Sequence, residues 1–166
     1  HAEVSAMAGA VVAETGSNWS IFHNPAGITE VDGIHLSAGS GNLYGFKWLP
    51  TYNLSGNVPL PVFGKIGFAL QQLETKYSGK TLSTEQTISV AQGFNLQKDK
   101  NSHLAIGYTA NLIQWKLGSS AGISGDGTDG LELGSINAVT VDLGVLASLR
   151  EKYRFGVFVK NINSGA

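Results

Sequence analysis

Apolar side chains recur at every second position along most of the chain from Gly33 onward, which is the spacing of a β-strand. The stretch at 139–149 shows the pattern clearly, because apolar residues alternate there with Thr140, Asp142 and Gly144. The pattern predicts seven strands, at residues 33–46, 51–60, 63–76, 86–97, 103–117, 136–149 and 153–162. We expect one antiparallel sheet, in which each strand pairs with the next along the chain.

Two irregularities and the lengths of the connections refine this picture. The alternation changes parity at Gln71 and Gln72, and again at Leu112 and Ile113, where a β-bulge would restore the facing. The connections after the second, fourth and sixth strands are short, whereas 77–85 and 118–135 read as long loops. Alternate connections of an up-and-down sheet lie on the same side. The short turns therefore collect at one end, as in bacterial outer-membrane barrels.

The short turns also predict a register. A last turn centred on Glu151 pairs Asp142 with Lys160, and a turn at 98–102 pairs Gly93 with Gly107. The first of these pairs brings opposite charges together, which is favourable across neighbouring strands.

Three charged residues fall on the polar face of the last two strands: Asp142, Arg154 and Lys160. They would set the polarity of a lumen or hold the N-terminal segment. The alternative is that they form internal ion pairs, since buried charges are usually paired.

The first 32 residues follow a different pattern and form a separate N-terminal segment, with the strands of the barrel in 33–166. Residues 5–14 are small and apolar and predict a short helix that ends near Gly16, and 18–23 predict one further helical turn. The sequence Asn24, Pro25, Ala26 and Gly27 then predicts a turn, because proline fixes φ and glycine accepts positive φ.

Composition favours a barrel over an ordinary soluble sheet. Only 14% of the 166 residues are charged and 22 are glycine, whereas about 25% charged residues and about 7% glycine are usual. The polar face carries Gly, Ala, Ser, Thr and Asn rather than Lys and Glu, which suits the interior of a barrel whose outside is apolar. We therefore expect an all-β, antiparallel up-and-down transmembrane β-barrel, or half of one. A soluble sandwich also alternates and is the alternative fold.

No catalytic residue, cofactor or metal site is expected, so the chain is not predicted to be an enzyme. It has no cysteine, and its net charge of -1 argues against a nucleic-acid partner. Residues 118–122 match G-x-S-x-G, but no helix pattern follows, as a nucleophile elbow requires. The acidic stretch at 125–130 lacks the spacing of a calcium-binding EF-hand, and the four histidines lack metal-ligand spacing. Trp48 and Trp115 fall near the long-loop ends of their strands, where they would form an interfacial aromatic girdle or pack in a core.

Two parts of the sequence resemble a known family. Residues 8–13 (AGAVVA), followed by Asn24, Pro25, Ala26, Gly27 and Ile28, resemble the start of mature outer-membrane proteins of the FadL-like superfamily. This superfamily includes long-chain fatty-acid transporters and the PorV/PorQ-type proteins of type IX secretion. Residues 141–146 and 155–162 are similar to a hairpin of the PorV-type branch.

The resemblance implies a fourteen-stranded barrel in the outer membrane of a Gram-negative bacterium, with the N-terminal segment plugging the lumen. The partners would be the lipid bilayer and either hydrophobic small molecules or a component of a secretion system. The chain departs from the family because it supplies about seven strands, and the open edges of half a barrel are not tolerated in lipid. Either the chain is part of a longer protein, or other copies close the sheet as a homo-oligomer. The alternative function is a structural subunit that assembles through its open edges into an extracellular sheath or fibre.

Overall fold

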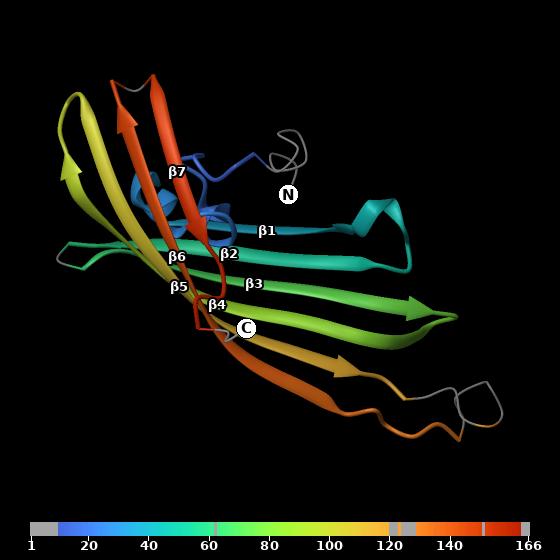
Figure 1. Cartoon of the computed structure of the whole chain (residues 1–166). Helices are drawn as coiled ribbons and strands as arrows, with labels where there is room; N and C mark the ends of the chain where they lie inside the picture. Colours follow the sequence, from blue (N-terminus) through green and yellow to red (C-terminus); the bar gives the residue numbers. More distant parts are fainter. Residues whose placement is uncertain (1–9, 62, 120–122, 124–128, 151, 164–166) are drawn as a thin grey trace.

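Seven antiparallel strands form one sheet that curls into a half-barrel (Figure 1). The computed structural model describes residues 10–61, 63–119, 123, 129–150 and 152–163. The strands follow one another across the sheet in chain order: β1 (His35–Asn42), β2 (Pro50–Leu60), β3 (Gly64–Tyr77), β4 (Lys80–Lys98), β5 (Ser102–Leu117), β6 (Ser135–Leu149) and β7 (Tyr153–Val159). The all-β class and the seven strands predicted from the alternation are confirmed.

Short 3-10 helices make up the rest of the regular structure: η1 (Asn18–Phe22), η2 (Pro25–Glu30) and η3 (Leu43–Gly45). The helical turn predicted at 18–23 is confirmed as η1. Asn24 and Pro25 do not form an isolated turn but begin η2, because the Asn24 side chain caps the helix and proline is suited to its first position. The described part of the helix predicted at 5–14 is a turn, in which Glu14 N donates to Val11 O at 3.0 Å; residues 5–9 lie outside the described residues.

The predicted register is confirmed at both short turns. Gly93 lies opposite Gly107, and Gly144 lies opposite Phe158, as the turn centres require. Strand β7 ends at Val159, so Lys160 does not pair with Asp142 in the ladder.

The predicted bulges at Gln71–Gln72 and Leu112–Ile113 are wrong. The β2–β3 and β5–β6 ladders pass through these residues without a shift. The irregularities lie on β4 instead, where Leu82 and Leu96 are the residues left out of the pairing. At the predicted places the strands stay regular and their apolar residues exchange faces.

The outer face changes from apolar to polar at one level on four neighbouring strands, and on β3, β5 and β6 apolar residues move to the inner face there. Gln72, Gln86, Gln114 and Asn137 pair in register across β3, β4, β5 and β6, and we call them the amide row. On the short-turn side of this row the outer face is apolar. On the other side the outer face is polar, and Leu73, Trp115 and Ile136 lie on the inner face.

The long loop predicted at 77–85 is also wrong. Strands β3 and β4 continue to Tyr77 and Lys80 and are joined by Ser78 and Gly79 alone, at φ 47° and 79°. Two residues with positive φ form the tight hairpin turn that matches strand twist. Residues 80–85 fall in the predicted loop because both faces of this part of the strand are polar.

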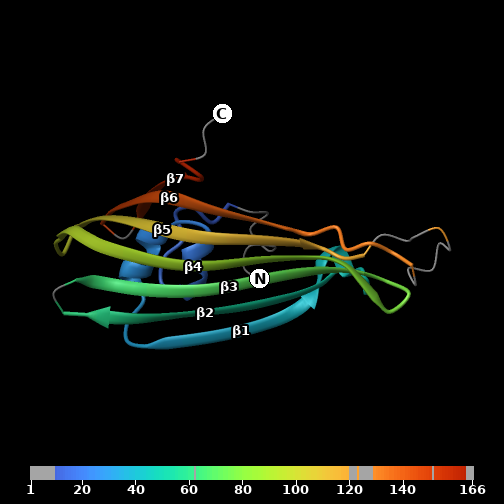
Figure 2. The same cartoon turned by 90° about the horizontal axis from the view of Figure 1, so that it is seen from below.

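The N-terminal segment, defined here as residues 10–32, lies against the inner face of the curled sheet (Figure 2). Three glycines in register, Gly93, Gly107 and Gly144, form the floor beneath it. A Cβ at Gly107 would lie 2.5 Å from the backbone carbon of Pro25, so only glycine permits this close approach. The buried core is small and lies in this contact, where Ile21 and Ile28 pack against Ala69 and Ala91 of the sheet.

Candidate functional site

The buried amide of Asn24 anchors the N-terminal segment. Its Nδ2 donates to Val12 O at 2.7 Å and to Val145 O on β6 at 2.9 Å. Its Oδ1 accepts from Ala26 N at 3.1 Å. One side chain therefore closes the segment on itself and ties it to the sheet, with every polar group of the amide satisfied.

Further contacts hold the segment on both sides of Asn24. The Asn18 amide donates to Ser37 Oγ of β1 at 3.0 Å and to Ser55 O of β2 at 3.3 Å. At the other end, Glu30 Oε1 lies 3.1 Å from His103 Nδ1 of β5. Lys65 of β3 donates to Val31 O. The segment is thus held by strands from one side of the half-barrel to the other.

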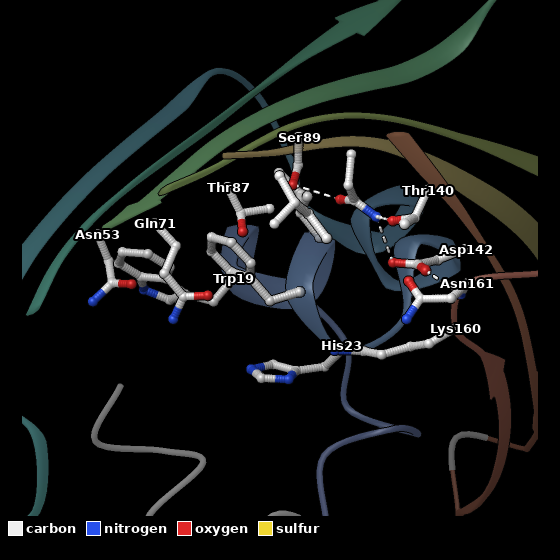
Figure 3. Close-up of a pocket in the computed structure, with 14 residues that line it drawn as sticks. Trp19, His23, Asn53, Gln71, Thr87, Ser89, Thr140, Asp142, Lys160 and Asn161 are labelled. Carbon is white, nitrogen blue, oxygen red and sulfur yellow. Dashed lines mark hydrogen bonds between the residues drawn. The ribbon is translucent and has the colours of Figure 1, made fainter. Parts of the chain in front are cut away.

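A cavity of about 410 Å³ lies between η1 and the inner face of the sheet (Figure 3). Strands β2 to β6, the N-terminal segment and the residues after β7 all contribute to its walls. The lining residues are Trp19, Ile21, Phe22, His23, Asn53, Gln71, Thr87, Ser89, Asn111, Ile113, Thr140, Asp142, Lys160 and Asn161. Most of them carry amide, hydroxyl or charged groups.

A chain of hydrogen bonds organises one end of the cavity. Ser89 Oγ donates to Asn111 Oδ1 at 2.6 Å, and Asn111 Nδ2 donates to Asp142 Oδ2 at 2.8 Å. The other carboxylate oxygen, Asp142 Oδ1, accepts from the backbone N of Asn161 at 2.8 Å. Bonds of this kind satisfy the carboxylate, which is only 6% exposed and forms no ion pair with a residue that the structure describes.

The three predicted lumen charges lie in different surroundings. Asp142 and Lys160 line the same cavity, but no ion pair joins them within the described part of the chain. The Lys160 ammonium instead lies 5.4 Å from the centre of the Phe158 ring. Arg154 is exposed, pairs with Ser148 near the start of β7 and does not line the cavity.

Burial lowers the pKa of His23 from 6.5 to about 4, and the nearby positive charge of Lys160 adds to this effect. The imidazole is therefore neutral at neutral pH. The cavity wall then carries one carboxylate and one ammonium group as its charged side chains.

The two predicted girdle tryptophans lie on different parts of the structure. Trp115 occupies the same face of β5 as Asn111, so it lies on the inner face, away from any lipid that would cover the outside. Trp48 lies in the β1–β2 connection and stacks on Phe46 with 5.2 Å between ring centres. Its role at an interface stays a prediction.

The weaker sequence motifs do not assemble a reactive site among the described residues. Gly118 N donates to Leu82 O at 2.7 Å, and Ser119 forms a bridge with Glu132, so the start of the G-x-S-x-G match pairs as a strand end. Its central Ser120 lies outside the described residues, as does most of the acidic stretch at 125–130. The described ranges contain no cluster of three potential His, Cys, Asp or Glu metal ligands.

Sequence reasoning did not identify the cavity residues apart from Asp142 and Lys160. The available signal was the row of inward polar residues on adjacent strands: Ser89, Asn111 and Thr140 pair directly across β4, β5 and β6. Trp19 and His23 gave no such signal, because nothing in the sequence shows where the N-terminal segment lies.

The chain matches no protein-family model, no curated protein and no solved structure. The relationship to the FadL-like superfamily therefore stays a prediction. Among the described residues, no helix is both long enough and apolar enough to span a bilayer.

Proposed function

We propose that the chain forms half of the wall of a β-barrel in the bacterial outer membrane, with its N-terminal segment as a plug. It is a conduit component of FadL or PorV type and not an enzyme. The resemblance implies two alternative functions for such a barrel, transport of hydrophobic solutes or a role in protein secretion. Both require the same plugged, membrane-embedded wall, which is the part that the geometry supports.

The apolar band on the outer face carries the proposal. On β5 the outward apolar positions run from Leu104 to Leu112, and on β6 they run from Val139 to Leu149. These stretches are 9 and 11 residues long, and a tilted membrane-spanning strand needs about 9–11. Eleven residues extend about 34 Å along the strand, which a tilt near 40° reduces to about 26 Å, close to the ~25 Å apolar band of such barrels.

The edges of the band support the same conclusion. It ends on one side at the amide row, where outward residues become polar on four strands at once. Its residues are exposed although they are apolar, as Val90 at 54% and Val139 at 64% show. The outward Gln92 within the band is satisfied by Tyr108 Oη at 2.5 Å and by Phe63 O at 2.8 Å. An apolar surface of this extent needs a cover, and lipid fits its shape.

Labelling at single cysteines tests the proposal, because the chain contains no native cysteine. A nitrobenzoxadiazole label is placed at Val90→Cys in the band, or at Gln114→Cys in the amide row as the matched outward control. The protein is reconstituted in vesicles whose acyl chains carry nitroxide groups, which quench this dye on contact. We expect strong quenching at position 90 and weak quenching at position 114. Equally weak quenching at both positions would overturn the membrane assignment.

The alternative function is a structural subunit of an extracellular sheath or fibre. The observation that favours it is that β1 and β7 each pair with only one strand within the described sheet. Such a subunit would sediment without detergent as regular filaments, whereas the proposed barrel component would need detergent to leave the membrane. Electron microscopy of the sedimented material separates the two.

A further inference from the structure

The composition of the cavity wall narrows the class of ligand that fits it. Its volume of about 410 Å³ lies within the ~300–1,000 Å³ typical of small-molecule sites. Only Trp19, Ile21, Phe22 and Ile113 among its 14 lining residues are apolar. An acyl chain in this space would cover amides and hydroxyls without giving them hydrogen bonds, which is costly. A polar ligand would replace the water that these groups bind.

The polar groups are arranged in two adjacent rows. Ser89, Asn111 and Thr140 form the row joined by hydrogen bonds, and it is rigid because each member lies on a paired strand. Asn53, Gln71 and Thr87 form the next row, on β2, β3 and β4.

The side chains of this second row make no hydrogen bonds to other described residues, although all three line the cavity. Amides offer donors and acceptors side by side, and a hydroxyl offers both on one atom. This set matches a ligand that carries several neighbouring hydroxyl groups.

Trp19 provides a flat apolar wall beside these amides. Its ring lines the cavity and is backed by Phe22, at 6.1 Å between ring centres. Figure 3 shows Asn53 and Gln71 beside Trp19, with Asp142, Asn161 and Lys160 at the opposite end. An aromatic face flanked by amides binds a ring that has an apolar face and a polar edge, as a pyranose has. The single carboxylate and single ammonium of the wall do not select a strongly charged ligand.

We propose that this cavity binds a neutral monosaccharide or disaccharide, with the sugar ring against Trp19 and its hydroxyl groups on the amides of Asn53 and Gln71. This inference rests on the proposed function, because it takes the ligand to be a solute that the barrel transports. It differs from the resemblance, which implies hydrophobic solutes.

The fluorescence of Trp19 tests the proposal directly. The double variant Trp48→Phe/Trp115→Phe leaves Trp19 as the only tryptophan, because the chain has three. The purified protein in detergent is titrated with glucose, galactose, N-acetylglucosamine, maltose and, as the competing class, palmitate. We expect a saturable change with at least one of the sugars and none with palmitate. The proposal is overturned if no sugar gives a saturable change, or if palmitate alone does.

A matched pair of variants locates the binding. Gln71→Ala removes an inward amide that makes no hydrogen bond to the described residues, whereas Gln86→Ala removes an outward amide of the amide row. We expect the first to weaken sugar binding at least tenfold and the second to leave it unchanged, with equal urea midpoints. Equal affinities in both variants would remove the cavity as the site. Lipid quenching at position 90 does not depend on this result, so the membrane assignment and the ligand assignment fail separately.

Discussion

Replacing Gly107 by alanine tests how the N-terminal segment is held. The new Cβ would lie 2.5 Å from the carbon of Pro25 and 2.6 Å from Ala26 N, about 0.9 Å inside the 3.4 Å where ordinary contact begins. Both neighbours are backbone atoms, so no side-chain rotation can relieve the clash. Overpacking of this kind costs about 1–3 kcal/mol. We expect Gly107→Ala to lower the free energy of unfolding by that amount and to loosen the segment.

Gly39→Ala is the matched control, because a Cβ at Gly39 meets nothing within 4 Å. Alanine is intrinsically favoured over glycine in a strand by roughly 0.5–1 kcal/mol, so this variant should be neutral or slightly more stable. Urea titration in detergent measures both variants, and limited proteolysis of the segment reports its release. The reasoning is refuted if the two variants unfold at the same urea concentration and protect the segment equally.

Three further predictions follow from the anchor, the cavity and the outer band. Asn24→Ala removes the side-chain donor to Val12 O and Val145 O and the cap of η2. Urea titration should show a loss of about 2–4 kcal/mol in the free energy of unfolding. The pKa of His23 is lowered from 6.5 to about 4, so the unfolded chain binds more protons than the folded chain between these pH values. The free energy of unfolding should therefore fall as the pH drops from 6.5 toward 4. Urea titrations of His23→Gln should show a smaller change of this free energy with pH. Val90→Lys should lower the free energy of unfolding in a bilayer by about 2–4 kcal/mol, whereas Gln86→Lys should leave it almost unchanged. Refolding titrations into vesicles measure both variants, and equal losses would contradict a lipid-covered band.

The strands and their register could be predicted because they depend on local information. Alternation reports which residues share a face, and a short turn then fixes the register of the two strands, as at Gly93 and Gly107. The polar stretch 80–85 gave no alternation, because neither of its faces is apolar, and the strand there was missed. Pairing with β3 and β5 makes it a strand, which is a tertiary effect that propensity does not contain.

The cavity could be predicted only in part. Asp142 was identified as an inward charge from its place in the alternation, and its burial agrees with that assignment. Its hydrogen-bond partners, Asn111 and the backbone of Asn161, come from different parts of the chain. The expectation of an ion pair with Lys160 followed from the register alone. In the structure β7 ends at Val159, one residue before Lys160. The Asn111 side chain and the backbone N of Asn161 donate to the carboxylate instead.

The two places where bulges were predicted, on β3 and on β5, give the main support for the proposed membrane assignment. A change of parity on one strand has two explanations: an extra residue, or an exchange of the faces on which apolar residues lie. A bulge is a property of one strand, so it has no reason to recur at the same level on its neighbours. At the amide row the outward residues of β3, β4, β5 and β6 become polar in register, and on β3, β5 and β6 apolar residues move to the inner face, so the change follows a level of the whole sheet and not a single strand. The proposed membrane assignment expects such a change at the edge of a bilayer, where the surroundings pass from apolar to aqueous, and the outward residues of these four strands change from apolar to polar at that level.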